Sequence, residues 1–177
     1  HDVYHKQEFL NKNPILKSLI LDSPNFLEEC KGVIPKNKIW AHISGTDLIK
    51  DHTGKFYVLE DNLRVPSGVA YMLENRNVMK KVVTELFNNY KVSPVDDYTS
   101  QLYKCLSDAS YSKDKKKTIV ILSPGVFNSA YFEHAYLAQQ MGIDLVESSD
   151  LSLSDDNYVY MKTISGKKKI DVIYRRI

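Results

Sequence analysis

Long apolar runs are missing from these 177 residues. A helix needs about 18 consecutive apolar residues to span a bilayer, and no stretch of the sequence approaches that length. The first ten residues, HDVYHKQEFL, lack the basic start and the apolar centre of a signal peptide. These absences predict a cytoplasmic protein with no membrane partner.

Cysteine and net charge are also scarce. The two cysteines, Cys30 and Cys105, have no CxxC spacing, so neither a disulfide framework nor a zinc site is expected. The formal net charge of +2 argues against nucleic acid as a partner, because nucleic-acid-binding domains usually carry a marked basic excess. The whole sequence has 43% hydrophobic and 26% charged residues, which is typical of a globular domain.

The first half of the chain is expected to contain helices and one β-hairpin. Residues 1–30 have a broken helical pattern, and residues 39–44 (IWAHIS) have the composition of a strand. Residues 46–51 and 55–61 alternate in polarity on either side of a glycine-containing turn, which predicts a hairpin. From Val69 to Tyr90 apolar residues recur at helical spacing, which predicts one helix with an apolar stripe facing a core.

The second half is expected to form a lobe of strands and helices after a proline-containing linker at residues 91–98. The apolar strand at 116–125, a helix and the strand at 143–148 predict a parallel βαβ unit. Residues 158–163 and 169–176 predict a second hairpin. The fold class is therefore α/β, a mixed sheet with flanking helices, divided into residues 1–92 (helices and first hairpin) and residues 93–177 (βαβ lobe).

Both ends of the sequence fall inside expected elements. HDVYHKQEFL begins a helical pattern without a capping residue, and IDVIYRRI finishes within an apolar strand pattern without a turn. We therefore expect a central fragment of a longer protein.

Polar residues occupy the end of the second hairpin strand, in the stretch VLEDNLRVPSG. Val58 and Leu59 are expected to anchor this strand in a core. Alternate residues of a strand share a face, so Glu60, Asn62 and Arg64 are expected on one face. Asp61 then lies on the other face.

Asp47 lies on the partner strand of this hairpin. A four-residue loop at 52–55 would place Asp47 directly opposite Glu60. Two carboxylates and the Asn62 amide oxygen are the hard donors that Mg²⁺ prefers, and the planar fork of Arg64 suits a phosphate or a carboxylate. A solvent-facing row on an edge strand, with Arg64 neutralising Glu60, is the alternative that spacing leaves open.

Longer strings carry a resemblance to a known family. ISGTDLIKDHTGKFYVLEDNLRVPSGVAYMLENR resembles the circularly permuted ATP-grasp proteins (type 2) related to glutathionylspermidine synthase. LSPGVFNSAYFEHAYLAQQMGIDLVES and DVIYRR are similar to later signatures of that family, in the same order. The resemblance is strong over residues 39–177 and loose over the first 38.

The resemblance implies an ATP-dependent carboxylate–amine ligase that acts through an acyl phosphate. Its hairpin would hold Mg²⁺ through Asp47, Glu60 and Asn62, and Glu60, Asn62 and the catalytic Arg64 would contact ATP. Ser67 and Gly68 would bind a small peptide-like or amine substrate. The βαβ part would be a Rossmann-like substrate lobe.

One family feature is missing from these residues. ATP-grasp catalysis needs a glycine-rich loop and a lysine that close over the phosphates, and no such segment is present. The chain alone is therefore expected to be inactive, and ATP and Mg²⁺ are expected to bind only with the remainder of its own chain.

Other polar residues have two interpretations each. Asn128 and Ser129 are either plain helix caps or caps that also hold a substrate carboxylate. Arg175 and Arg176 face opposite sides of a strand; one contacts a phosphate or acidic substrate, or forms a structural ion pair. Glu133 and His134 point in different directions, so no shared metal site is expected, and His134 is expected to be a hydrogen-bonding residue of the interior or of the rim.

The sequence alone leaves open a second class of function besides a ligase. The chain can also be a non-catalytic α/β module that binds a small anionic peptide or a protein partner, with a structural acidic hairpin. Convergence of the oxygens of Asp47, Glu60 and Asn62 would favour the metal site over this module.

Overall fold

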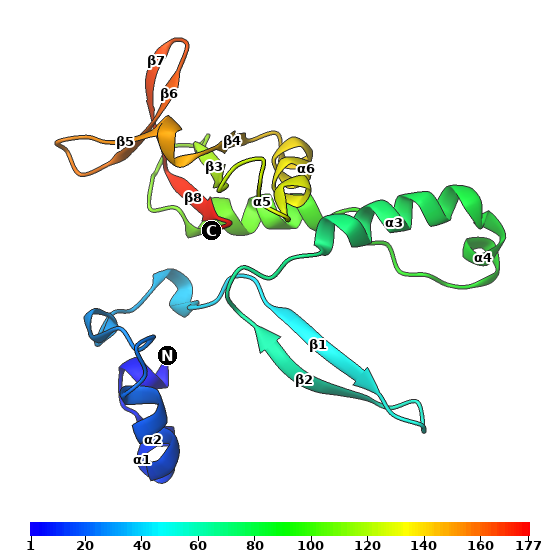
Figure 1. Ribbon diagram of the computed structural model, residues 1–177, viewed down its shortest axis with the longest axis horizontal. Helices are drawn as coiled ribbons and strands as arrows, with labels where there is room; N and C mark the ends of the chain where they lie inside the picture. The colour runs from blue at the N-terminus through cyan, green and yellow to red at the C-terminus, as the bar shows by residue number, and fades with distance from the viewer. The chain divides into compact units, whose positions relative to one another are not determined.

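The computed structural model describes residues 1–177 and has the predicted α/β composition. The chain divides into two compact units, His1–His42 and Ile43–Ile177 (Figure 1). The unit Ile43–Ile177 contains both the first hairpin and the βαβ lobe, and the expected division of the chain at residues 92 and 93 stays a prediction.

The unit His1–His42 consists of short helical turns. Pro14 opens α2, a position where the missing N–H of proline costs no hydrogen bond. The ring of Tyr4 stacks on Phe26 and on Trp40, with centroids 5.0 and 5.1 Å away. The elements are η1 (Asp2–Tyr4), α1 (Glu8–Lys12), α2 (Pro14–Leu21), η2 (Glu28–Cys30) and η3 (Lys36–Lys38).

The strand expected at residues 39–44 is not formed. Asn37 and Lys38 just before it adopt left-handed backbone conformations, with φ of 57° and 58°. No strand lies within this unit to complete a ladder, and an extended segment needs such a partner for its backbone groups. His42 therefore does not lie on a strand.

The first hairpin consists of β1 (Gly45–Lys50) and β2 (Phe56–Asn62), paired antiparallel. The Asp51 carboxylate accepts hydrogen bonds from the Thr53 and Lys55 amides at 2.8 and 3.0 Å. The Asp51 N–H in turn donates to the Lys55 carbonyl. This closes a three-residue turn at residues 52–54, shorter than the expected loop.

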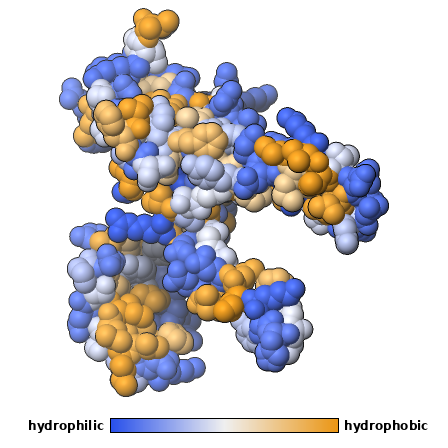
Figure 2. Space-filling view, turned by 45° about the vertical axis from the view of Figure 1, so that its right-hand side comes forward, coloured by the Kyte–Doolittle hydropathy of each residue, from blue (hydrophilic) through white to orange (hydrophobic).

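The helical stretch after the hairpin is two helices, α3 (Val69–Val82) and α4 (Thr84–Asn89), where the pattern predicted one. Val83 leaves the helical region (φ −123°, ψ 49°) within three consecutive β-branched residues, which are weak helix formers. The apolar stripe does not face a core: Met79, Val82 and Leu86 are 46%, 75% and 47% exposed. Figure 2 shows apolar surface over these helices.

The βαβ unit is confirmed in the second half of the chain. Strands β3 (Ile119–Leu122), β4 (Asp144–Val146) and β8 (Val172–Arg175) form a parallel sheet in the order β4-β3-β8. Helices α5 (Tyr98–Ala109) and α6 (Tyr131–Met141) lie beside this sheet (Figure 1). All four residues of β3 are buried, which is expected of a central parallel strand.

The last part of the chain departs from the predicted hairpin. β6 (Val159–Thr163) and β7 (Gly166–Lys169) form one, extended by β5 (Leu151–Leu153) after η4 (Ser148–Asp150). Residues 169–176 are not one strand, because the chain turns at Asp171 and its last strand, β8, joins β3 instead. The Asp171 carboxylate accepts the Thr118 N–H at 2.7 Å and holds this turn. No helix in the chain has the length and apolar composition that crossing a bilayer requires.

Candidate functional site

Three oxygen-bearing side chains gather on one face of the β1–β2 hairpin. Asp47 pairs with Glu60 across the ladder, and Gly45 pairs with Asn62. The Asn62 amide nitrogen donates to Asp47 Oδ2 at 3.4 Å and to Glu60 Oε1 at 3.3 Å. The residues assigned to a metal from the sequence are thus brought together by the fold.

A β-bulge produces this arrangement. From the turn outward the paired positions are Lys50 with Phe56 and Leu48 with Val58, and the register then shifts so that Asp47 pairs with Glu60. A regular hairpin on this three-residue turn would place Asp47 opposite Leu59 and send Glu60 to the other face. The extra residue in β2 therefore does what a four-residue loop was expected to do.

The other face of the hairpin holds Asp61. Its carboxylate accepts hydrogen bonds from the hydroxyls of Thr46 at 2.6 Å and Ser44 at 3.3 Å. Asp61 therefore has a local structural partner and does not reach the three oxygen-bearing side chains.

Val58 and Leu59 do not anchor β2 in a core. They are 60% and 66% exposed, and Leu48 and Phe56 beside them are 56% and 62% exposed. The hairpin is a two-stranded sheet, and no other strand or buried cluster of the chain covers these side chains.

Arg64 follows β2 and is exposed. The ion pairs of the chain do not include one between Arg64 and Glu60. The alternative interpretation is a solvent-facing row with Arg64 neutralising Glu60: Asp47, Glu60 and Asn62 are indeed exposed, but the ion pair is not formed.

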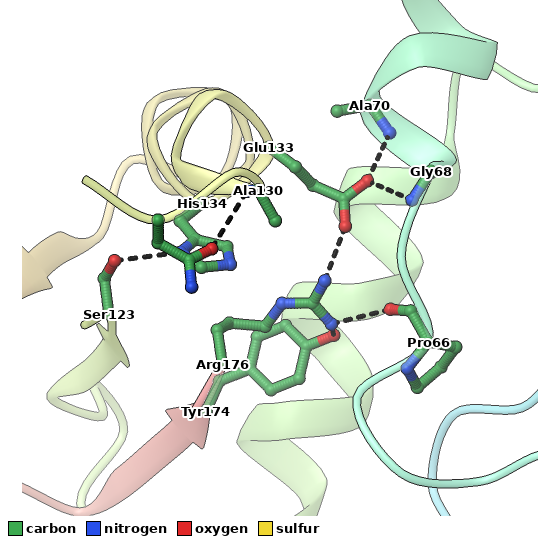
Figure 3. A network of polar contacts seen from close by, with 10 residues as sticks. Pro66, Gly68, Ala70, Ser123, Ala130, Glu133, His134, Tyr174 and Arg176 are labelled. Atoms are coloured by element: carbon green, nitrogen blue, oxygen red, sulfur yellow. Dashed lines mark hydrogen bonds and ion pairs between the residues drawn. The ribbon is translucent and has the colours of Figure 1, made fainter. Parts of the chain in front are cut away.

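A buried polar network holds the segment that follows Arg64 (Figure 3). Arg176 Nη2 contacts Glu133 Oε1 at 2.5 Å. Glu133 Oε2 accepts the backbone N–H of Gly68 at 2.7 Å and of Ala70 at 3.0 Å. Arg176 Nη1 donates to the Pro66 carbonyl at 2.7 Å and to the Tyr174 hydroxyl at 3.1 Å.

Comparison with known protein families matches residues 1–177, the whole chain, to the circularly permuted ATP-grasp type 2 family. The chain belongs to this ATP-grasp family. Its membership agrees with the oxygen-bearing hairpin and with the parallel βαβ lobe.

The relatives of this ATP-grasp chain are longer proteins. An uncharacterized protein of Mycobacterium tuberculosis is 48% identical over 99% of this chain and 32% of its own length. One of Synechocystis is 44% identical over 99% of this chain and 36% of its own length. A Frankia casuarinae protein, provisionally named a glutamate–cysteine ligase, is 33% identical over 100% of this chain and 21% of its own length. The chain thus spans about a fifth to a third of these relatives.

The donor set of this ATP-grasp chain fits a hard cation. Carboxylate and amide oxygens suit Mg²⁺, which also keeps water and phosphate ligands. The chain contains no cluster of three or more histidine, cysteine, aspartate and glutamate side chains suited to a metal. Asp47, Glu60 and Asn62 are the residues that would hold such a cation, with the Asn62 amide turned so that its oxygen replaces the nitrogen that now donates to both carboxylates.

The remaining predicted substrate residues are distributed along the lobe. Asn128 Oδ1 accepts the Ala130 N–H at 2.9 Å in the turn before α6. The N-cap of α6 is Ala130 and has no side-chain cap, so neither Asn128 nor the exposed Ser129 caps this helix as predicted. Arg175 is exposed at the end of β8, whereas Arg176 is 3% exposed. Arg176 thus has the structural ion pair that was one of its two interpretations.

His134 makes an interior hydrogen bond, as expected. It is 1% exposed, and its Nδ1 lies 2.8 Å from the Ser123 hydroxyl, which also accepts the Gly125 N–H. Burial and the nearby Arg176 guanidinium lower the pKa of His134 below its ordinary value, against the opposing effect of Glu133. His134 is therefore a neutral packing residue.

Glu133 is the residue whose role the sequence pattern did not reveal. It lies four residues before Leu137, which is 1% exposed, so both point from the same inward face of α6. A carboxylate on a core-facing helical stripe is the signal that indicates a buried partner, because a buried charge is rarely left unpaired.

Proposed function

We propose that this chain is the metal- and substrate-binding part of a longer ATP- and Mg²⁺-dependent carboxylate–amine ligase. The observation that carries the proposal is the gathering of Asp47, Glu60 and Asn62 on one hairpin face. Membership of an ATP-grasp family supports it, as does the relative provisionally named a glutamate–cysteine ligase.

The reaction forms an amide in two steps. A substrate carboxylate oxygen attacks the γ-phosphorus of ATP, ADP leaves, and an acyl phosphate forms. An amine then attacks the acyl carbon, phosphate leaves, and the amine nitrogen loses a proton. The acyl phosphate is sensitive to water, so a closed site is needed.

The chain's residues have separate roles in this scheme. Asp47, Glu60 and Asn62 would hold Mg²⁺, which neutralises charge on the phosphate oxygens. Arg64 presents its guanidinium to the transferring phosphoryl group, where charge develops. Ser67 contacts the peptide-like or amine substrate beside it, and Arg175, Asn128 and Ser129 are candidates for its carboxylate.

In this proposal, residues in the remainder of the longer protein close over the phosphates of the nucleotide. No glycine-rich, lysine-bearing phosphate loop is present in these 177 residues. The exposed apolar side chains of β2 and of α3 and α4 are surfaces that this remainder would cover. The chain alone is expected to be catalytically inactive.

The same exposed surfaces favour a second candidate, a non-catalytic module that binds a small anionic peptide or a protein partner. Apolar patches of this kind are typical of interaction sites. In that case the acidic hairpin is structural, and ATP is not consumed.

Trapping of the acyl phosphate tests the ligase proposal. The longer protein is incubated with ATP, Mg²⁺ and candidate acids, glutamate and γ-glutamyl peptides among them, with hydroxylamine in place of the amine. The ligase forms a hydroxamate and ADP in equal amounts, and omission of the acid abolishes both. ADP release that is independent of any acid, or no ADP release at all, would reject the proposal.

A further inference from the structure

The segment Pro66–Ala70 joins the candidate metal hairpin to α3. It is held by two side chains from distant parts of the sequence, Glu133 on α6 and Arg176 after β8 (Figure 3). The Glu133 carboxylate accepts hydrogen bonds from the N–H groups at the start of α3, and the Arg176 guanidinium donates one to the Pro66 carbonyl. The Glu133–Arg176 pair therefore fixes both sides of the turn at Ser67.

Both charges of the pair are removed from water. The side chains of Glu133 and Arg176 are each 1% exposed. Removing two charges from water is costly, and an apolar pair of similar volume often stabilises a fold as well or better. A contribution to global stability is thus a weak explanation for the presence of this ion pair. Its control of the conformation of the segment that it binds explains it better.

The backbone immediately before that segment is strained. Val65 has a φ of 50°, a left-handed conformation that is a marked outlier for a β-branched residue. Residues before a proline also prefer extended conformations. Such strain persists only where surrounding contacts determine the backbone, and the Pro66 carbonyl held by Arg176 is adjacent to it.

The Glu133 carboxylate also occupies the N-terminus of α3. An anion there is stabilised by free N–H groups and by the helix dipole. Because Gly68 and Ala70 already donate to Glu133 Oε2, these N–H groups are not open to a substrate carboxylate. Within this turn Arg64 and Ser67 remain as the exposed polar side chains.

We propose that Glu133 and Arg176 are positioning residues that set the conformation of Arg64–Gly68 for the reaction. The inference rests on the proposed ligase function, since Arg64 and Ser67 are the groups that it would orient relative to Asn62. Neither Glu133 nor Arg176 contacts the reacting atoms. Their contribution to rate comes from holding the turn, and a misplacement of about 1 Å in such a group lowers rates by about a hundredfold.

The test uses the longer protein with a neutral double variant, E133M/R176M, which also removes the side-chain oxygen that accepts the Gly68 and Ala70 N–H groups. The double variant removes both charges together, so it avoids an unpaired buried charge and is expected to fold. A single variant, R176K, keeps the charge but replaces the two guanidinium nitrogens, which bond Pro66 and Glu133 separately, by one ammonium nitrogen. D96N is the matched control, since it removes a carboxylate that pairs with Lys80 on the exposed surface.

Two readouts separate positioning from packing. The first is the split between kcat and the KM for ATP. The second is hydrogen exchange at the Gly68 and Ala70 amides, relative to amides of β3. We expect the double variant and R176K to lower kcat about tenfold or more with little change in the KM for ATP. The double variant exchanges Gly68 and Ala70 about tenfold faster while β3 stays protected.

Several results would overturn the proposal. A double variant with wild-type kcat would show a packing role alone, and unchanged exchange at Gly68 and Ala70 would show that the pair does not hold the turn. If the double variant does not fold, R176K decides by the same criteria. A wild-type protein without turnover would reject the ligase function, and the exchange measurement would still decide whether the pair holds the turn.

Discussion

Asp47 and Glu60 lie directly opposite each other across the β1–β2 ladder, and the bulge beside Leu48 puts them there. The register on the turn side of the bulge, continued without it, would separate the two carboxylates onto opposite faces. The bulge and the short turn therefore act together to assemble the candidate metal site.

Two deletions test the bulge. Removing Leu59 takes out the extra residue and leaves Glu60 opposite Asp47, so the longer protein is expected to keep ATP turnover within a few-fold. Removing Asp61 shifts Asn62 by one position to the other face, and turnover is expected to fall about a hundredfold. Equal losses in both variants would mean that register does not govern the site.

Gly45 tests the junction between the hairpin and the Pro66 turn. A Cβ at this position would lie 2.8 Å from the Pro66 Cβ, closer than carbon atoms approach without displacement. G45A is expected to lower the free energy of unfolding by about 1–3 kcal/mol, the usual cost of overpacking. Urea denaturation measures this, and an unchanged midpoint would show that the junction is loose.

The free energy of unfolding is expected to decrease as pH falls, because the folded chain binds a proton at His134 more weakly than the unfolded chain does. The pKa of His134 is lowered in the folded chain, chiefly by burial, so the unfolded chain binds a proton first as pH falls. The free energy of unfolding should decrease by about 1 kcal/mol per pH unit below about pH 6.5, until the folded pKa is passed. This contribution is fully present above pH 6.5.

The pH dependence has a matched comparison. H134F removes the buried imidazole and should flatten the slope between about pH 6.5 and 5. H52N changes an exposed histidine in the hairpin turn and should keep the wild-type slope. Thermal unfolding at a series of pH values distinguishes them, and parallel slopes in all three proteins would contradict a buried neutral His134.

Local patterns predicted the elements that local forces determine. Alternation located β1 and β2, and a continuous apolar run located β3 within a βαβ unit. Alternation also predicted that Asp61 lies on the face of β2 opposite to the face of Glu60 and Asn62. These predictions depend on residues near in sequence, where side-chain direction follows from backbone type.

The features that local sequence patterns did not predict depend on contacts between residues far apart in the sequence. The stripe on α3 and α4 is apolar but exposed in this chain, so periodicity indicated a face without showing what covers it. The end of β7 depends on Asp171 reaching Thr118. Likewise, Glu133 and Arg176 are 43 positions apart, and no local pattern couples them to Pro66 and Gly68.

A comparison of E60Q with D61N in the longer protein tests the central claim most directly. The two changes convert adjacent carboxylates to amides on opposite faces of β2. Mg²⁺-dependent ADP formation should fall about a hundredfold or more in E60Q, because a charged metal ligand is lost. It should stay within a few-fold in D61N. Equal rates in the two variants, or a larger loss in D61N, would contradict a metal site at Asp47, Glu60 and Asn62.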